Sequence, residues 1–234
     1  MQAVILTGGL GTRLGPMTQR VPKGMIEVQG RPFLEYQLDL LRRSGIDGVV
    51  LCVGHLGGMI EDHFGNGSKF GLDLRYSRDG PRLLGPAGAL KRAEPLLGDR
   101  FFVTYGDAYL RVPYRALMGS FQASGRLAMM ATYRNENRHG RSDVDVRGRY
   151  VVRYDKEGRG GLKWINFGVT ALQKPALSLI PKGVEYGEED FYNDLIARRE
   201  LLSYPVTRRF YEIGTPASLA EFARFAAREG LLPP

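Results

Sequence analysis

Short apolar runs rich in β-branched residues alternate with helical patterns along the first 130 residues of this 234-residue chain. The expected strands cover residues 3–6, 49–53, 72–76, 101–105 and 127–133. The expected helices run from Pro32 to Ser44 and over 59–64, 88–97 and 114–123. Parallel neighbours need a crossover connection, so this alternation favours βαβ units. The sequence therefore predicts an α/β fold with a mainly parallel sheet.

The pattern changes from about residue 140. Further β segments are expected at 144–146, 150–154 and 165–172, the first two as a hairpin across Gly148, and further helices at 191–199 and 217–228. No internal repeat, low-complexity segment or long linker divides the chain. We expect one domain over residues 1–234, with the later β region as a lobe on the same sheet.

The chain carries 33 lysine and arginine residues against 25 aspartate and glutamate residues, a net charge of +8. Such a surplus predicts an anionic partner, either nucleic acid or a phosphorylated small molecule. Residues 1–43 carry +3 and residues 132–163 carry +4, so the surplus lies in two stretches and not in a tail. Tyrosine and phenylalanine follow core spacings, so we expect no nucleic-acid partner.

Cysteine and histidine are too few for a disulfide framework or a zinc cluster: the chain has one cysteine and three histidines. We expect Cys52, within an apolar run, to be a small buried side chain.

The N-terminus lacks the basic region and apolar run of a signal peptide, and no apolar run reaches the roughly 18 residues of a membrane span. We therefore expect a soluble cytoplasmic protein with no membrane partner.

The strongest motif follows the first expected strand, where residues 6–23 read LTGGLGTRLGPMTQRVPK. A glycine-rich turn at this place lets backbone N–H groups approach an anion closely. The dinucleotide fingerprint would need glycine at Leu14, and the Walker A motif would need a Gly-Lys pair that the chain lacks. Arg13 and Lys23 add two cations suited to phosphate oxygens, so the loop is suited to a phosphate chain.

This loop resembles the signature of the sugar-1-phosphate nucleotidyltransferases, Gly-Gly-x-Gly-Thr-Arg-Leu-x-Pro-x-Thr followed by Pro-Lys. Further family segments occur in the expected order: GRPFLEY at 30–36, LGPAGAL at 84–90, YGD at 105–107, INFG at 165–168 and EIGTP at 212–216. The ordered set spans nearly the whole chain. The resemblance implies a Rossmann-like three-layer α/β/α sandwich with a mixed, mainly parallel central sheet.

Members of this family join a nucleoside triphosphate to a sugar 1-phosphate, which gives a nucleotide-sugar and pyrophosphate. The resemblance implies that residues 1–131 form a nucleotide-binding half and residues 132–234 a sugar-phosphate-binding half. It assigns catalysis to Arg13 and Lys23, which would neutralise the phosphates. The implied nucleotide-binding residues are Leu6, Gly8, Gly9, Gly11, Thr12, Gly88 and Gly106. Gly9 and Gly88 are expected close to the base or ribose, where a side chain would intrude.

The resemblance also implies a Mg²⁺ cofactor, held by Asp107 and Glu212. A carboxylate after a strand fits this hard cation, which prefers oxygen ligands and phosphate partners. Relatives usually have aspartate at the second position, and the longer glutamate changes the reach of that ligand. A separate Asp143-Val144-Asp145 segment resembles the D-x-D metal motif of glycosyltransferases, but we expect these two carboxylates on an edge strand, exposed to water.

The sugar-phosphate side is implied to use Gly140, Lys156 and Asn166. The family's Glu-Lys-Pro is here Asp155-Lys156-Glu157, and Lys163 is a rival for the phosphate-binding lysine.

The implied substrates are GTP with a heptose or mannose 1-phosphate, because residues 165–168 and 191–201 look most like those guanylyltransferases. The alternative is a uridylyltransferase for N-acetylmuramate 1-phosphate, or an enzyme for another pair of nucleoside triphosphate and sugar 1-phosphate. Another class, a catalytically inactive nucleotide-sugar-binding regulatory subunit, is suggested by the glutamates at 157 and 212. Relatives often form dimers or tetramers, so a homo-oligomer is possible.

Overall fold

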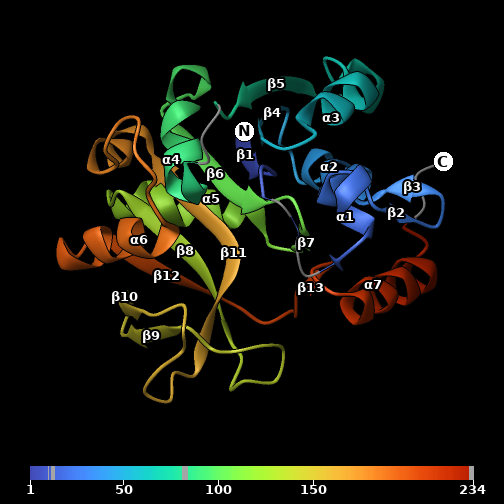
Figure 1. Ribbon diagram of the computed structural model, residues 1–234. Helices are drawn as coiled ribbons and strands as arrows, with labels where there is room; N and C mark the ends of the chain where they lie inside the picture. Colours follow the sequence, from blue (N-terminus) through green and yellow to red (C-terminus); the bar gives the residue numbers. More distant parts are fainter. Residues whose placement is uncertain (10, 12–13, 81–83, 232–234) are drawn as a thin grey trace.

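A nine-stranded sheet forms the centre of the protein in the computed structural model, which describes residues 1–9, 11, 14–80 and 84–231 (Figure 1). The strand order is β5-β4-β1-β6-β11-β8-β12-β10-β9, and an additional pairing of β9 with β11 closes the last five strands into a small barrel. The strands are β1 (Gln2–Leu6), β4 (Gly48–Val53), β5 (Asp73–Arg78), β6 (Arg100–Tyr105), β8 (Ala128–Arg134), β9 (Val144–Arg147), β10 (Tyr150–Tyr154), β11 (Trp164–Gln173) and β12 (Leu201–Val206).

The expected mainly parallel sheet is not confirmed. Strands β5, β4, β1 and β6 pair in parallel, as does β8 with β12. Strand β11 instead runs antiparallel to β6, β8 and β9, and β10 runs antiparallel to β9 and β12. No helix lies between β8 and β11 to carry the chain back across the sheet, so this stretch returns by antiparallel pairing. The fold is mixed α/β.

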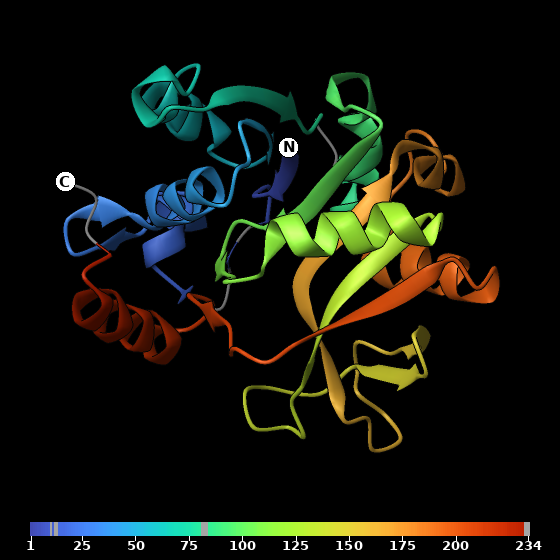
Figure 2. The same cartoon turned by 180° about the vertical axis from the view of Figure 1, so that it is seen from behind.

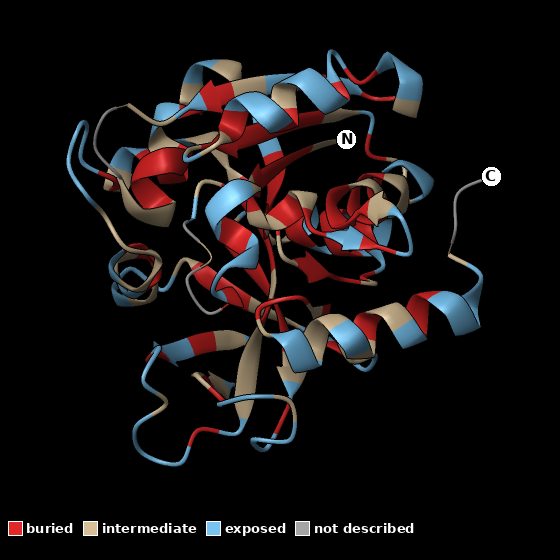
Figure 3. Cartoon of the chain, turned by 45° about the vertical axis from the view of Figure 1, so that its right-hand side comes forward, coloured by how far each residue is buried: buried red, intermediate tan, exposed pale blue. Residues whose placement is uncertain are grey.

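Helices pack on both faces of the sheet, as the views from front and back show (Figures 1 and 2). One apolar core joins Ala3 and Ile5 of β1 to α2, α3 and α5, while Val4 faces a second core with α4 and α6. Successive strand residues point to opposite faces, so a strand buried on both sides reads as a continuous apolar run. Buried residues accordingly gather along the strands (Figure 3). The helices are α1 (Met17–Arg20), α2 (Phe33–Arg43), α3 (Gly57–Phe64), α4 (Gly85–Arg92), α5 (Tyr114–Ser124), α6 (Glu188–Ala197) and α7 (Pro216–Glu229).

Several elements differ from the sequence expectation. Strand β12 was not expected, because Ser203 and Pro205 break its apolar pattern, yet it lies inside the sheet between β8 and β10. Helix α4 begins three residues earlier than expected and ends at Arg92, before a separate 3₁₀ turn that contains Pro95. Two-residue strands form small ladders outside the main sheet: β2 (Glu27–Val28) with β3 (Arg31–Pro32), and β7 (Ala108–Tyr109) with β13 (Tyr211–Glu212).

Strands from the two expected halves interleave in one sheet, because β11 lies between β6 and β8. The division into nucleotide-binding and sugar-phosphate-binding halves therefore does not coincide with a break in the sheet. Among the described residues, no helix has the length and apolar character needed to cross a membrane.

Candidate active site

A pocket of about 350 Å³ lies at the carboxyl ends of β1, β4 and β6, the edge at which open α/β sheets bind ligands. Of the residues assigned from the family resemblance, Leu6, Gly8, Gly9, Gly11, Lys23, Gly106 and Asp107 line it. Its other lining residues are Thr7, Gly24, Cys52, Asp79, Gly85, Pro86, Ala89 and Tyr105. Thr12 and Arg13 lie outside the described residues. The pocket therefore brings together segments that lie 100 residues apart in the sequence.

The three loop glycines that the resemblance assigns to nucleotide binding, Gly8, Gly9 and Gly11, differ in what surrounds them. A Cβ on Gly8 would lie 2.7 Å from Oδ2 of Asp79, and one on Gly11 would lie 2.8 Å from Cγ2 of Thr18. Gly11 also has a φ of +64°, which disfavours a side chain. Among the residues that the structure describes, no atom lies within 4 Å of a Cβ built on Gly9. With respect to these residues, Gly9 thus leaves open space beside the pocket, where a ligand can approach the backbone.

Lys23 and Asp107 form an ion pair in the pocket, with 2.5 Å between the lysine Nζ and the carboxylate Oδ2. Lys23 opens a 3₁₀ turn (Lys23–Met25) directly after Pro22, and Asp107 lies in the tight turn between β6 and β7. The Lys23 side chain is only 13% exposed. This pair concentrates a cation and a carboxylate at one end of the pocket.

Glu212 is brought next to Asp107 by the β7–β13 ladder. The ladder pairs Glu212 with Ala108, and the N–H of Ile213 donates to the carbonyl of Asp107 at 2.9 Å. The Glu212 carboxylate accepts a hydrogen bond from the N–H of Gly214 at 2.6 Å. Although Glu212 is not among the pocket-lining residues, the ladder fixes its backbone one residue away from the Asp107 turn.

These two carboxylates fit a magnesium ion in kind and number. Mg²⁺ is usually bound by one or two carboxylates together with substrate phosphates and water, and not by an all-protein cage. Within the described residues, no group of three or more acidic, histidine or cysteine side chains is gathered as a metal site. Asp107 and Glu212 would supply the protein's oxygen ligands, and the substrate phosphates the others.

Asp79, which sequence reasoning missed, lies at the other side of the pocket. It follows β5, and its N–H donates to the carbonyl of Val53 at 2.8 Å. Burial raises the pKa of the Asp79 carboxyl, and the positive charge of Arg92 opposes that rise. In a sequence, a single aspartate after a strand is interpreted as a turn residue. Only the order of the strands in the sheet reveals that Asp79 faces the glycine loop.

Cys52 is buried as expected, at 1% exposure, and it also contributes to the pocket lining. Burial raises the pKa of its thiol, which keeps the side chain neutral.

Gly88 lies in α4 against another part of the chain. A Cβ there would be 2.8 Å from Cβ of Leu84 and 3.0 Å from the carbonyl oxygen of Val184. The N–H groups of Ala87 and Gly88 donate to the carbonyl of Tyr186 at 3.2 and 3.3 Å. The structure therefore uses the missing side chain of Gly88 to seat the 184–186 segment on the start of α4, while other α4 residues line the pocket.

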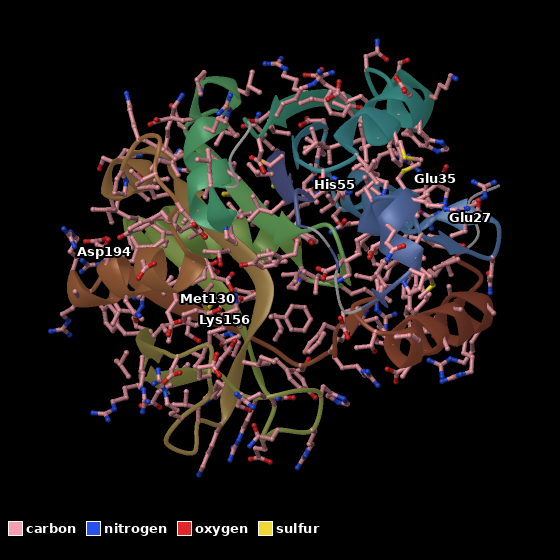
Figure 4. All side chains as sticks on the ribbon, in the orientation of Figure 1. Glu27, Glu35, His55, Met130, Lys156 and Asp194 are labelled. Carbon is pink, nitrogen blue, oxygen red and sulfur yellow. The ribbon has the colours of Figure 1, made fainter. Side chains whose placement is uncertain are left out.

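Lys156, which the resemblance assigns to the sugar phosphate, lies beside a partly buried carboxylate, Glu188, at the start of α6. Glu188 accepts hydrogen bonds from the hydroxyls of Tyr105 and Tyr154, the latter at 3.1 Å, and lies 3.4 Å from Nζ of Lys156. Lys156, which follows β10, is labelled in Figure 4. Because Tyr105 also lines the pocket, this cluster adjoins the pocket directly. Glu188 was not singled out from the sequence, where it is one of three consecutive acidic residues.

Asn166 and Gly140, the other two residues assigned to the sugar phosphate, are held by hydrogen bonds that involve the backbone. The N–H of Asn166 donates to the Asp143 carboxylate at 2.8 Å, and its side-chain oxygen accepts from the N–H of Gly168 at 2.9 Å. Gly140 has a φ of +98°, and its carbonyl accepts from the amide of Asn135 at 2.8 Å. The rival Lys163 is exposed, and its carbonyl accepts the N–H groups of Asn135 and Glu136.

Asp143 corrects an expectation, because its carboxylate is not exposed to water as the edge-strand interpretation required. Burial raises the pKa of Asp143 to about 7, with a further rise from the negative charge of Glu188. The Asn166 N–H and the charge of Lys156 oppose the rise. The closure of the barrel, which pairs β9 with β11, shields this strand.

Comparison with known proteins agrees with this geometry. Residues 2–152 match the model of the family described as nucleotidyl transferase. The chain is 30% identical over 221 residues to a D-glycero-alpha-D-manno-heptose 1-phosphate guanylyltransferase from Aneurinibacillus thermoaerophilus, covering 92% of this chain and 94% of that protein. It is also 30% identical over 203 residues to a UTP–glucose-1-phosphate uridylyltransferase from Synechocystis, which covers 80% of this chain and about half (52%) of that protein's length.

Among solved structures, HddC from Yersinia pseudotuberculosis in complex with GMP-PN superimposes with a TM-score of 0.80 at 22% identity, covering 96% of this chain and 98% of that one. This likeness shows the shared fold. The family match and the relatives that cover most of the chain identify it further: the chain belongs to the nucleotidyl transferase family, among the sugar-1-phosphate nucleotidyltransferases.

Proposed function

We propose that this protein transfers a nucleotidyl group from GTP to a heptose or mannose 1-phosphate, with release of pyrophosphate and with dependence on Mg²⁺. The observation that carries the choice of base is the Asp79 carboxylate in the pocket. The reaction class itself follows from family membership.

The reaction asks for positioning and charge neutralisation. The attacking phosphate oxygen is already ionised at neutral pH, so no general base is required. The barrier lies in bringing two anions together and in stabilising charge at the α-phosphorus. Lys23 and Arg13 would supply positive charge to the phosphates, and Gly8, Gly9 and Gly11 would let backbone N–H groups approach them. A bound Mg²⁺ at Asp107 and Glu212 would neutralise phosphate charge.

The order of the strands supports an orientation of the nucleotide in which its phosphates lie near Asp107 and its base near Asp79. Asp107 follows β6 and Asp79 follows β5, and these strands are separated by β1 and β4. At about 4.8 Å per strand, the two carboxylates stand on strands roughly 14 Å apart. Phosphates at Lys23 and Asp107 therefore leave the base beside Asp79.

A carboxylate at this place favours guanine over the other bases. Guanine presents two adjacent donors, N1–H and the 2-amino group, which both match a carboxylate. Uracil and thymine present one donor flanked by two carbonyl oxygens, which a carboxylate repels. On adenine and cytosine, a ring nitrogen acceptor stands next to the amino group. A two-point contact of this kind discriminates by about 1–3 kcal/mol, or about 5- to 150-fold.

The test incubates the purified protein and Mg²⁺ with each pair drawn from five nucleoside triphosphates and several sugar 1-phosphates. Pyrophosphate release is measured for every pair. We expect release with GTP and a heptose or mannose 1-phosphate. Release only with UTP and N-acetylmuramate 1-phosphate would replace the proposed substrates by the alternative pair. No release with any pair, together with nucleotide binding, would favour an inactive regulatory subunit.

Asp79→Asn tests the base assignment. We expect kcat/KM for GTP to fall by at least about fivefold, because an amide offers only one acceptor to the two guanine donors. Asp73→Asn is the matched control, because Asp73 is an exposed carboxylate at the start of β5, the strand that Asp79 follows. An unchanged preference for GTP in Asp79→Asn would contradict the assignment.

A further inference from the structure

A buried glutamine holds the turn that carries Asp107. Gln37, on α2, is 2% exposed, and its side-chain Nε2 donates to the carbonyls of Tyr105 at 2.7 Å and Ala108 at 3.1 Å. These two carbonyls stand on either side of Gly106 and Asp107. One amide group therefore clamps both ends of the two-residue turn.

The clamp orients the amide unambiguously, because both partners are acceptors and only the NH₂ group can serve them. The oxygen of the same amide, Oε1 of Gln37, is buried and has no hydrogen-bond partner in the part of the chain that the structure describes. A buried acceptor without a partner is unfavourable, because it has given up its hydrogen bonds to water and gained none in return. Gln37 thus keeps its two hydrogen bonds to the turn although its side-chain oxygen is left without a hydrogen bond.

Backbone contacts fix the same turn from its other sides. The N–H of Gly106 donates to the carbonyl of Leu6 at 2.9 Å, and the carbonyl of Asp107 accepts from Ile213 at 2.9 Å. A Cβ on Gly106 would lie 2.5 Å from Cγ2 of Thr7, so the turn packs closely on the end of β1. In addition to these backbone contacts, the hydrogen bonds of Gln37 connect the turn to α2.

We propose that Gln37 is a positioning residue: it fixes the Gly106–Asp107 turn so that the Asp107 carboxylate meets Lys23 and the divalent cation. The inference rests on the proposed function, because that function gives the cation to Asp107. Gln37 itself touches neither substrate nor cation, and it acts through the two carbonyls that it holds.

The experiment compares Gln37→Met with Gln2→Met. Gln2 is a matched control, because its side chain also makes two bonds to a turn: Nε2 donates to the carbonyl of Leu96 at 3.0 Å, and Oε1 accepts from the N–H of Gly98 at 2.8 Å. That turn precedes β6, at the opposite end of the strand from Asp107. Both variants lose two side-chain hydrogen bonds, but only one of them loses contacts at the candidate cation site.

The readout is binding of Mn²⁺ to the protein in the presence of GTP, measured as the loss of the electron paramagnetic resonance signal of free Mn²⁺ relative to the same Mn²⁺ and GTP without protein. We expect Gln37→Met to weaken Mn²⁺ binding at least about tenfold, as changes to residues that orient metal ligands commonly do. Gln2→Met should bind Mn²⁺ as the unaltered protein does, even where it unfolds more easily. Gln37→Asn, which keeps an amide but is one methylene shorter, serves as a second variant should Gln37→Met fail to fold, and should weaken binding similarly.

Equal Mn²⁺ binding by the Gln37 variants and the unaltered protein would overturn the proposal, as would equal losses in the Gln37 and Gln2 variants. Absence of Mn²⁺ binding by the unaltered protein with GTP would overturn it as well. Failure of the proposed function is a separate result: the protein would bind Mn²⁺ and GTP but release no pyrophosphate with any substrate pair, and the comparison of Mn²⁺ affinities would still decide the role of Gln37.

Discussion

Replacement of the half-buried Asp143 by asparagine should stabilise the protein, and the gain should grow with pH. In the structure, the Asp143 carboxylate accepts one hydrogen bond, from the N–H of Asn166 at 2.8 Å. It lies in the field of the Glu188 carboxylate, which disfavours its charged form, and of Lys156, which favours it. An asparagine keeps an oxygen for the Asn166 N–H and removes the charge. The exchange therefore isolates the free energy of ionisation.

The magnitude follows from the pKa of Asp143, which burial raises from 3.8 to about 7. Between these values the folded protein holds a proton that the unfolded chain has lost, so this carboxyl lowers the free energy of unfolding as pH rises through that window. At about 1.36 kcal/mol per pKa unit, the full effect is about 4 kcal/mol. Of this, about 2.5 kcal/mol is lost between pH 5 and pH 8.

The assay is urea unfolding of the unaltered protein and of Asp143→Asn at pH 5, 6, 7 and 8. We expect the difference in free energy of unfolding between the two proteins to increase by about 2.5 kcal/mol from pH 5 to pH 8. Asp145→Asn controls for loss of a negative charge two residues further along the chain, on β9, because Asp145 forms an ion pair with Arg147 at 3.6 Å on the protein surface. A stability difference for Asp143→Asn that does not change with pH would refute the reasoning.

Three further predictions concern the pocket and the sugar side. Arg13→Ala should lower turnover at least about tenfold in the pyrophosphate assay, since about 1.4 kcal/mol of lost transition-state stabilisation is enough; near-normal turnover would show that the family role does not apply to this arginine. Gly106→Ala should lower the free energy of unfolding by about 1–3 kcal/mol, because its Cβ would overlap Thr7, whereas Gly9→Ala should leave stability nearly unchanged and weaken binding of the nucleotide. Urea unfolding and nucleotide titration separate these two glycines, and a stable Gly106→Ala would contradict the packing argument. Lys156→Met should raise KM for the sugar 1-phosphate more than KM for the nucleotide, and an equal effect on both would contradict a sugar-side role.

The parallel part of the fold could be predicted from sequence because its inner strands, β4, β1 and β6, are buried on both faces. Ala3, Val4 and Ile5 are each fully buried, and such runs are visible without knowledge of their neighbours. Strand β12 could not be predicted, because Ser203 and Pro205 interrupt its apolar pattern and its partners on both sides come from distant parts of the chain. Local sequence carries no record of such long-range pairing.

The candidate site likewise contains residues that could be predicted from the sequence and residues that could not. The glycine loop and Lys23 follow one another in the sequence and form a motif, so they could be assigned from it. Asp79 and Gln37 could not, because each is a single polar residue whose neighbours come from distant strands. Asp143 was expected to be exposed, since the sequence does not reveal that β9 pairs with β11 to close the barrel.

The closed barrel also bears on how copies of this protein behave toward one another in concentrated solution. A strand with an open edge offers N–H and C=O groups to any other chain, and extended exposed edges promote aggregation. Strand β9, last in the sheet order, turns back onto β11, while β5 at the other end presents the exposed charged residues Asp73, Arg75 and Arg78. One end of the sheet is thus blocked by its own pairing and the other by charge. Apolar substitutions at these three positions of β5 would remove that charge barrier to edge-to-edge association.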